Sequence, residues 1–380
     1  MNLRVPFQRP LMPPMEEVSR YFDKSIGEGF FSNGGPCATM LEERLAERLG
    51  VAHVVLVNNA TSGLMVAADA VFGRGARPML SGEPRGIVLV PSFTFAATVT
   101  SLLSMGFLPC LIDIDLETLQ VDPESLAEGL ERWGSKVCGA LLTSTFGIAA
   151  PEVISNAWEN LCSEAGVPTL FDSAAGFGSV ADSGRVLGSS GRTEVFSFHA
   201  TKPFAVGEGG CVVTNDAHVA AEMRRLINFG FGADRVVHGT PGINGKMPEI
   251  LCAIGLAVLD SFDTVIARRQ DNARAMTSQL TSSLGIPPGL LSSAVQFVPA
   301  LVDPAKRDRL VYTAEKRGVG LRTYFDPPIH LMPGFAQLQH LELPATETAS
   351  LMSVSLPMSN TISASDIAYV ASVVNECLCA

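Results

Sequence analysis

The stretch Val195-Phe-Ser-Phe-His-Ala-Thr-Lys202, followed by Gly207-Glu-Gly-Gly210, is the most informative part of this 380-residue chain. An apolar, β-rich run ends in a lysine, and a glycine-rich bend comes after it. A lysine at the end of a strand can form a Schiff base when its surroundings lower the pKa of its amine. Most lysines in such a pattern are ordinary surface charges, so this stretch alone is weak evidence for a covalent role of Lys202.

A second stretch, Leu170-Phe-Asp172-Ser-Ala-Ala-Gly-Phe-Gly178, places a carboxylate at the end of another apolar strand. Pyridoxal phosphate needs an acid beside its pyridine nitrogen and a lysine for its aldehyde, and Asp172 and Lys202 supply these two groups. An aspartate at this point is also an ordinary helix cap or turn residue. Asp172 by itself therefore leaves both interpretations open.

Two further loops connect a strand to a helix. Val57-Asn-Asn-Ala-Thr61-Ser62-Gly-Leu opens a helix with small and hydroxyl-bearing residues, which can present N–H and hydroxyl groups to a phosphate or simply cap the helix. Val90-Pro-Ser-Phe-Thr-Phe95-Ala-Ala-Thr carries aromatic residues at a similar junction. Phe95 can stack on a planar ring there, although ordinary core packing explains it equally well.

These stretches belong to an alternation of strand-like and helix-like segments over residues 50–260, which predicts an α/β domain with a mainly parallel sheet. In such sheets the ligand binds beyond the carboxyl ends of the strands. The expected strands are Val54–Val57, Ile87–Val90, Leu108–Asp113, Val137–Leu142, Thr169–Asp172, Val195–His199 and Gly210–Thr214, and the expected helices are Met15–Ile26, Cys37–Leu49, Ser62–Val71, Ala96–Met105, Pro123–Trp133 and Pro151–Ala165.

The apolar spacing after residue 248 predicts one long helix over residues 249–285, leading into a second domain. The remainder has short strands (Val295–Ala300, Gly320–Arg322, Ser353–Ser355) and two helices (Lys306–Arg317, Ser363–Cys377), which is typical of a smaller α+β domain. We therefore expect an N-terminal arm (1–35), a cofactor-binding α/β domain (36–260) and a small C-terminal α+β domain (261–380).

Composition excludes several function classes. The net charge of −11 argues against nucleic-acid binding, which relies on lysine and arginine to neutralise phosphates. Mean hydropathy is +0.28, yet no run of about 18 apolar residues predicts a membrane span. No signal peptide is visible, so we expect a cytoplasmic protein. The six histidines are scattered without ligand spacing, and we expect no metal site.

In their chain order these stretches resemble the DegT-type sugar aminotransferases, which are pyridoxal-phosphate enzymes of fold type I, the aspartate aminotransferase fold. The likeness extends over nearly the whole chain. It includes Phe31-Ser-Asn-Gly-Gly-Pro36, Asn228-Phe-Gly230, Gly242-Ile-Asn-Gly-Lys-Met-Pro-Glu249, Ile329-His-Leu-Met-Pro333 and Leu356-Pro-Met358 as well as the four stretches above.

The resemblance implies a role for each matching residue. Lys202 would bind the cofactor covalently and move the proton, and Asp172 would pair with the pyridine nitrogen. The other implied cofactor contacts are Phe95 and Ala174 on the two ring faces and Thr61, Ser62 and Ser197 at the phosphate. Asn228 would reach the phosphate from the neighbouring subunit of a homodimer, and Asn244, Lys246 and His330 would line the substrate pocket.

The chain departs from the family pattern at two positions. Ala175 stands where many members have a glutamine or histidine that contacts the phenolic oxygen of the cofactor, and an alanine side chain cannot make that hydrogen bond. Phe229 stands where the family often has histidine.

The resemblance implies transfer of an amino group from glutamate to a cyclic ketone, and we expect a dTDP-type nucleotide-linked keto-deoxysugar. Two alternatives remain open: a free carbocyclic ketone as the substrate, or a non-catalytic family member, which Ala175 favours and Lys202 and Asp172 oppose. The expected ligands are anionic, so we also expect a locally positive pocket on this acidic chain.

Overall fold

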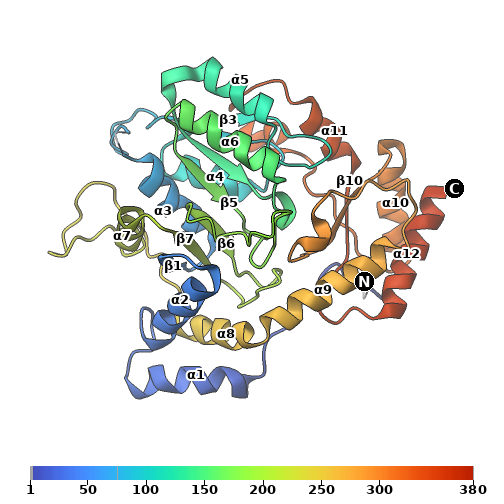
Figure 1. The fold of residues 1–380 in the computed structure, drawn as a ribbon, viewed down its shortest axis with the longest axis horizontal. Coiled ribbons are helices and arrows are strands. Elements are labelled where there is room, and N and C mark those ends of the chain that lie inside the picture. The colour runs from blue at the N-terminus through green and yellow to red at the C-terminus, as the bar shows by residue number, and fades with distance from the viewer. Residues whose placement is uncertain (1–2, 75, 380) are drawn as a thin grey trace.

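An eight-stranded sheet in the order β1-β7-β6-β5-β4-β2-β3-β9 forms the centre of the computed structural model, which describes residues 3–74 and 76–379 (Figure 1). Strand β7 is antiparallel to both neighbours and every other pair is parallel, so the predicted mainly parallel sheet is confirmed. The strands are β1 (His53–Val57), β2 (Ile87–Pro91), β3 (Leu108–Ile112), β4 (Val137–Thr143), β5 (Thr169–Asp172), β6 (Glu194–Ser197), β7 (Gly210–Thr214) and β9 (Gln339–His340).

Helices cover both faces of this sheet because its strands are apolar on both faces. Neighbouring residues of a strand point to opposite sides, so Val88 packs with Leu64 of α3 while Leu89 packs with Trp158 of α6. The helices are α1 (Met15–Gly27), α2 (Pro36–Leu49), α3 (Ala60–Phe72), α4 (Ala96–Ser104), α5 (Pro123–Trp133), α6 (Glu152–Glu164), α7 (Ala217–Leu226), α8 (Glu249–Asp260), α9 (Phe262–Thr277), α10 (Pro304–Lys316), α11 (Pro344–Met352) and α12 (Ala364–Cys379).

The single helix expected over residues 249–285 is wrong. The chain forms two helices, α8 and α9, with a bend of 63° at Ser261, and α9 ends at Thr277 (Figure 1). Phe262, which follows the bend, is fully buried against Phe177 and Phe204. Apolar spacing continued through the bend, so periodicity alone did not reveal it. The domain boundaries remain predictions, and the bend lies next to the one proposed at residue 260.

A smaller antiparallel sheet pairs β8 (Val298–Leu301) with β10 (Ser353–Leu356), and α10, α11 and α12 pack near it (Figure 1). Two short strands expected here differ in the structure. Residues 320–322 make only isolated bridge contacts, such as Arg322 with Ser355, and the strand expected from Val295 begins at Val298. A positive φ of 45° at Val295 turns the backbone away from strand geometry before β8.

Asp113 joins the C-terminal part of the chain to the large sheet. Its carboxylate accepts hydrogen bonds from the backbone N–H groups of Ala345 (2.9 Å) and Thr346 (2.8 Å) in the first turn of α11. Strand β9, just before α11, adds to the sheet beside β3. A carboxylate at a helix N-terminus satisfies backbone donors that the helix itself leaves unpaired. Asp113 therefore has a structural role.

No single helix in residues 3–74 and 76–379 is long and apolar enough to cross a membrane. The bent pair α8 and α9 passes such a test together, by length and composition only.

Glu249 holds α2 and α8 together from a fully buried position. Its carboxylate accepts hydrogen bonds from the backbone N–H groups of Gly35 (2.8 Å), Cys37 (2.9 Å) and Ala38 (3.0 Å) and from the hydroxyl of Ser25 (2.7 Å). These donors include the first free N–H groups of α2, whose positive dipole end favours an anion. One side chain therefore caps a helix that lies more than two hundred residues earlier in the chain.

We predict that Glu249→Ala lowers the free energy of unfolding by roughly 3 kcal/mol, because four buried donors lose their acceptor at once. Urea denaturation followed by circular dichroism measures the change. The control Glu152→Ala removes an exposed glutamate from the first turn of α6 and should cost less than about 0.5 kcal/mol. Equal effects of the two substitutions would contradict this role for Glu249.

Candidate functional site

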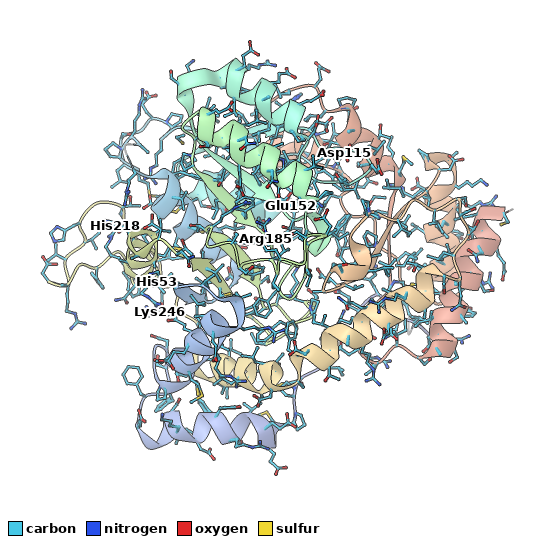
Figure 2. All side chains as sticks on the ribbon, in the orientation of Figure 1. His53, Asp115, Glu152, Arg185, His218 and Lys246 are labelled. Atoms are coloured by element: carbon cyan, nitrogen blue, oxygen red, sulfur yellow. The ribbon has the colours of Figure 1, made fainter. Side chains whose placement is uncertain are left out.

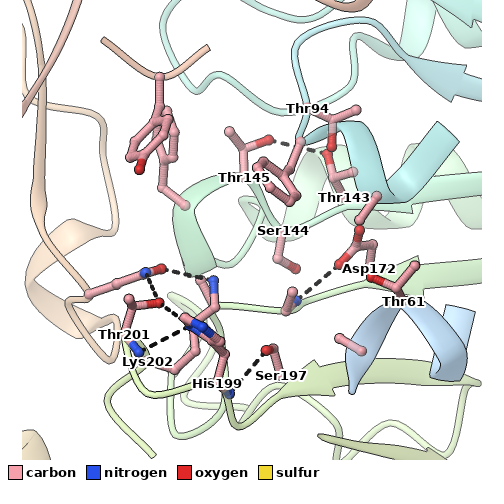
Figure 3. Close-up of a pocket in the computed structure, with 18 of the residues that line it drawn as sticks. Thr61, Thr94, Thr143, Ser144, Thr145, Asp172, Ser197, His199, Thr201 and Lys202 are labelled. Atoms are coloured by element: carbon pink, nitrogen blue, oxygen red, sulfur yellow. Dashed lines mark hydrogen bonds between the residues drawn. The ribbon is translucent and has the colours of Figure 1, made fainter. Parts of the chain in front are cut away.

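A cavity of about 410 Å³ lies beyond the carboxyl ends of the parallel strands and brings together most of the predicted residues (Figure 3). Its walls come from both ends of the chain: Gln8, the start of α3, the segments after β2, β4, β5 and β6, and two segments near β8. Predicted site residues that line it are Thr61, Phe95, Asp172, Ala174, Ser197 and Lys202.

Asp172 ends β5 and is buried at the base of this cavity. Its carboxylate accepts hydrogen bonds from the hydroxyl of Thr98 (2.8 Å) and from the backbone N–H of Ala174 (3.1 Å). Burial raises the pKa of the carboxyl group, and those two donors together with the positive Lys202 oppose the rise. The charge of Asp172 is thus supported by specific neighbours in a site that water hardly reaches.

Lys202 lies in the loop after β6, on the opposite side of the same cavity (Figure 3). Its Nζ donates a hydrogen bond to Oε1 of Gln296 at 3.1 Å. Burial lowers the pKa of the amine to about 8, although the negative Asp172 acts in the other direction. An amine with this pKa is partly neutral near physiological pH, as a nucleophile or general base must be.

The loop from Asn59 to Ser62 lies at the N-terminus of α3. Asn59 caps the helix by accepting a hydrogen bond from the N–H of Ser62 at 2.8 Å. Asn59, Ala60 and Thr61 line the cavity, whereas Ser62 is not among the lining residues. The N-terminus of a helix favours anions, so the cavity has a place for a phosphate at this edge.

Phe95 and Ala174 also line the cavity. Phe95 precedes α4 and is 62% exposed, which is unusual for a phenylalanine that serves only the core. Ala174 and Ala175 add a small apolar surface after β5. An exposed aromatic ring and a small residue are compatible with a flat ring bound between them.

Three predicted residues lie together, but outside this cavity. Asn228 and Asn244 form an antiparallel bridge, and Nζ of Lys246 donates to Oδ1 of Asn228 at 3.1 Å. The same Nζ lies 4.8 Å from the ring centre of Phe229. Figure 2 shows Lys246 on the side of the molecule that carries His53 and His218, from β1 and α7. We name Asn228, Phe229, Asn244 and Lys246 the 228–246 patch.

His330 does not line the cavity either. Its side chain is buried, with Nδ1 2.8 Å from the hydroxyl oxygen of Ser92 and Nε2 3.5 Å from a carboxylate oxygen of Glu347. Burial lowers the pKa of this imidazole, while Glu347 opposes the change. The position of His330 between β2 and α11 gives no support to the predicted substrate contact.

Several lining residues were missed by the sequence analysis. Phe146 lies three residues after the end of β4, and its place after an apolar strand could have been noticed. Gln296, Phe297, Tyr324 and Phe325 come from the C-terminal third of the chain and meet the cavity only through the tertiary fold. The rings of Phe297, Tyr324 and Phe325 pack on one another and on Phe146, so this wall of the cavity has an aromatic surface.

The expected excess of positive charge is absent from the cavity wall formed by the described residues. Lys202 is the one lysine or arginine there, and it is accompanied by the carboxylates of Asp172 and Glu208. His199 adds a charge only when it is protonated. The expectation of a locally positive pocket is therefore wrong for the wall that this chain supplies itself.

The comparisons with known proteins agree with this geometry. The model of the DegT/DnrJ/EryC1/StrS aminotransferase family matches residues 15–375. The chain belongs to this family. Its members are pyridoxal-phosphate-dependent aminotransferases of fold type I, and so is this chain.

Relatives with described names include enzymes of sugar metabolism. The chain is 33% identical to Protein Rv3402c of Mycobacterium tuberculosis, covering 98% of this chain and 90% of that protein. It is 30% identical to the dTDP-4-amino-4,6-dideoxy-D-glucose transaminase of Shigella dysenteriae, covering 97% of each. The solved structure of DesI in the presence of its TDP-sugar product superposes with a TM-score of 0.88 at 33% identity, covering 100% of this chain and 93% of that one.

The cavity fits pyridoxal phosphate on its own features. A buried carboxylate, a lysine of lowered pKa, an exposed aromatic ring and a helix N-terminus all line one space of suitable size. When bound, this cofactor supplies the electron sink that stabilises negative charge on the substrate carbon. Lys202, Asp172, Phe95, Ala174 and Thr61 line this space and would hold the cofactor.

We predict that the cofactor-free chain captures pyridoxal phosphate faster as the pH rises through about 8, and at a constant rate above it. Only the neutral amine of Lys202 reacts, and its pKa lies near 8 rather than at the ordinary value of 10.5. Stopped-flow absorbance measures the rate. Lys136→Ala, which removes an exposed lysine, is the control and should not change the profile. A rate that keeps rising to pH 10 would contradict the lowered pKa.

Proposed function

We propose that this aminotransferase moves an amino group from glutamate to a nucleotide-linked keto-deoxysugar of the dTDP type. The single observation that carries the aminotransferase chemistry is the meeting of Asp172 and Lys202 in one buried cavity. The sugar nucleotide is supported by the names of two relatives, a dTDP-sugar transaminase and DesI with its TDP-sugar product.

Each residue has a defined task in this proposal. Asp172 keeps its negative charge opposite the pyridine nitrogen, held in place by Thr98 and Ala174. Nζ of Lys202 holds the cofactor. Once released, it takes a proton from the reacting carbon of the amino donor. In the second half of the reaction it gives a proton to the carbon that receives the amino group. Thr61 and Ser197, with the N-terminus of α3, bind the phosphate. Phe95 and Ala174 contact the two faces of the flat ring and hold its position.

We further propose that the active unit is a homodimer with shared sites. The 228–246 patch carries an exposed asparagine, a lysine and an aromatic ring that is 45% exposed, and it lies outside the cavity of its own chain. In the part of the wall formed by the described residues, Lys202 is the one lysine or arginine, whereas a sugar diphosphate carries two negative phosphates. A second copy that places its Lys246 and Asn228 at this cavity would supply a further positive charge and an amide donor for the phosphate.

A free carbocyclic ketone is the second candidate substrate. The specific observation in its favour is the same shortage of positive charge, because an uncharged cyclitol ketone needs no cation. The aromatic wall of Phe146, Phe297, Tyr324 and Phe325 can contact the apolar face of either kind of ring.

A substrate panel separates the two candidates. The enzyme is loaded with pyridoxal phosphate, incubated with glutamate and offered either dTDP-linked ketosugars or free cyclitol ketones, and the amines are detected by mass spectrometry. We expect turnover with the nucleotide-linked ketones only. Lys202→Ala should reduce it at least about a hundredfold, because it removes the acid and base of the reaction. Turnover restricted to free cyclitol ketones would overturn the sugar-nucleotide proposal.

Mixing two inactive variants tests the shared site. We predict that Lys202→Ala and Asn228→Ala, each nearly inactive alone, recover about a quarter of normal activity when refolded together in equal amounts. Half of the random dimers are then mixed, and each of these has one intact site. Activity assays before and after mixing measure the recovery. If Lys202→Ala and Asn228→Ala show no recovery although mixed dimers form, the two residues serve the same chain's site.

A further inference from the structure

The amine of Lys202 is held by a residue from a distant part of the chain. Its Nζ donates to Oε1 of Gln296 at 3.1 Å, and Gln296 lies two residues before the start of β8, 94 residues further along the chain. Gln296 is only 7% exposed and lines the cavity beside Lys202. Asp172 acts on the amine through its charge, whereas its oxygens are engaged by Thr98 and Ala174.

Two neighbours set the orientation of the Gln296 amide. Its Nε2 lies 3.5 Å from the hydroxyl oxygen of Thr201, which in turn lies 2.8 Å from Nδ1 of His199 (Figure 3). The charged amine of Lys202 only donates, so the amide oxygen Oε1 must face Nζ, and Nε2 then donates to the hydroxyl of Thr201, which can accept. The glutamine therefore presents its acceptor to Lys202.

The backbone of Gln296 is also anchored. Nη1 of Arg269 in α9 donates to the carbonyl oxygens of Val295 (2.9 Å) and Gln296 (3.4 Å), and its Nε donates to Asn360 at 2.5 Å. Arg269 is buried, and none of the described residues forms a salt bridge with it. The guanidinium of Arg269 therefore donates its hydrogen bonds to Asn360 and to the backbone of the segment that carries Gln296, and these bonds fix that segment in place.

We propose that Gln296 is a positioning residue for Lys202, whose amide oxygen holds Nζ in the cavity whenever the amine is not bonded to the cofactor. This role rests on the proposed function of Lys202. An acceptor at 3.1 Å binds the charged amine more strongly than the neutral one, so Gln296 also supports the protonated form. In this proposal the charged and the neutral amine both stay beside Oε1 of Gln296, and from this position Nζ can give or take a proton.

Other titratable groups near this amine are few. Asp172 and Glu208 line the same cavity with negative charge, His199 lies beyond Thr201, and the charge of Arg269 lies behind the backbone of Gln296. Gln296→Met changes none of these charges. It removes the acceptor for Nζ and the longer contact of Nε2 with the hydroxyl of Thr201, and only the first of these touches the amine. A shift of the midpoint in this variant therefore reports on the contact with Nζ.

The test measures the protonation of Lys202 in the cofactor-free chain. Competitive acetylation across a pH series, read by mass spectrometry of the Lys202 peptide, gives the midpoint at which the amine becomes reactive. Gln296→Met keeps the length of the side chain and removes the acceptor, and Gln296→Glu replaces the amide by a charge. The control is Gln8→Met, since Gln8 lines the same cavity but donates to the backbone oxygen of Thr201 instead.

We expect the midpoint to fall by about half a pH unit in Gln296→Met and to rise by about one unit or more in Gln296→Glu. Gln8→Met should leave it unchanged. In the loaded enzyme, Gln296→Met should lower kcat about tenfold with little change in KM, because ground-state binding does not involve this contact. Opposite shifts of the midpoint are not produced by a merely structural role.

An unchanged midpoint in both Gln296 variants, with circular dichroism showing a folded chain, overturns the proposal. If Gln296→Met fails to fold, the test rests on Gln296→Glu alone. A rise in its acetylation midpoint then supports the proposal, and an unchanged midpoint overturns it. Because acetylation needs no cofactor, failure here is distinguishable from failure of the proposed function. That function fails if the unaltered enzyme transfers no amino group, whatever the midpoint of Lys202.

Discussion

The buried carboxylate of Asp172 and the buried amine of Lys202 face one cavity, and the rest of the site depends on keeping these two opposite charges there. Burial disfavours both charged forms, raising the pKa of one and lowering that of the other. Each charge partly compensates the other, and Thr98, Ala174 and Gln296 supply hydrogen bonds. The chemical result is a lysine with a pKa of about 8 instead of its ordinary 10.5, so that a fraction of the amine is neutral at physiological pH.

The parallel sheet is what makes this meeting possible. Strands β5 and β6 are adjacent and parallel, so the segments after them begin at the same edge. The antiparallel β7 and the capped helix α3 close the neighbouring side. The C-terminal part of the chain then completes the wall, tied to the sheet by Asp113 and β9. Its anchored segment brings Gln296 to the amine.

The predictions from sequence succeeded where the information was local. Seven of the eight strands of the large sheet were expected, because each is an apolar run bounded by turn residues. Strand β9 was missed, since two exposed residues, Gln339 and His340, carry no apolar signal. The helix over 249–285 was overextended, because α8 and α9 share one apolar spacing across Ser261. A local motif also does not show how far a residue lies from the cavity, which is why His330 was expected at the substrate although it does not line the cavity.

By itself the sequence determined most of the strands and helices, the family and the identities of the lysine and the aspartate at the strand ends, since these follow from local pattern and motif. Only the tertiary structure decided which residues complete the cavity. Gln296, Phe297, Tyr324 and Phe325 reach it through packing between segments far apart in the chain. Likewise only the fold showed that the wall formed by residues 3–74 and 76–379 lacks the expected excess of positive charge. The physical reason is that the apolar periodicity of a segment reports only on that segment, whereas the cavity is built by packing between segments that lie far apart in the chain.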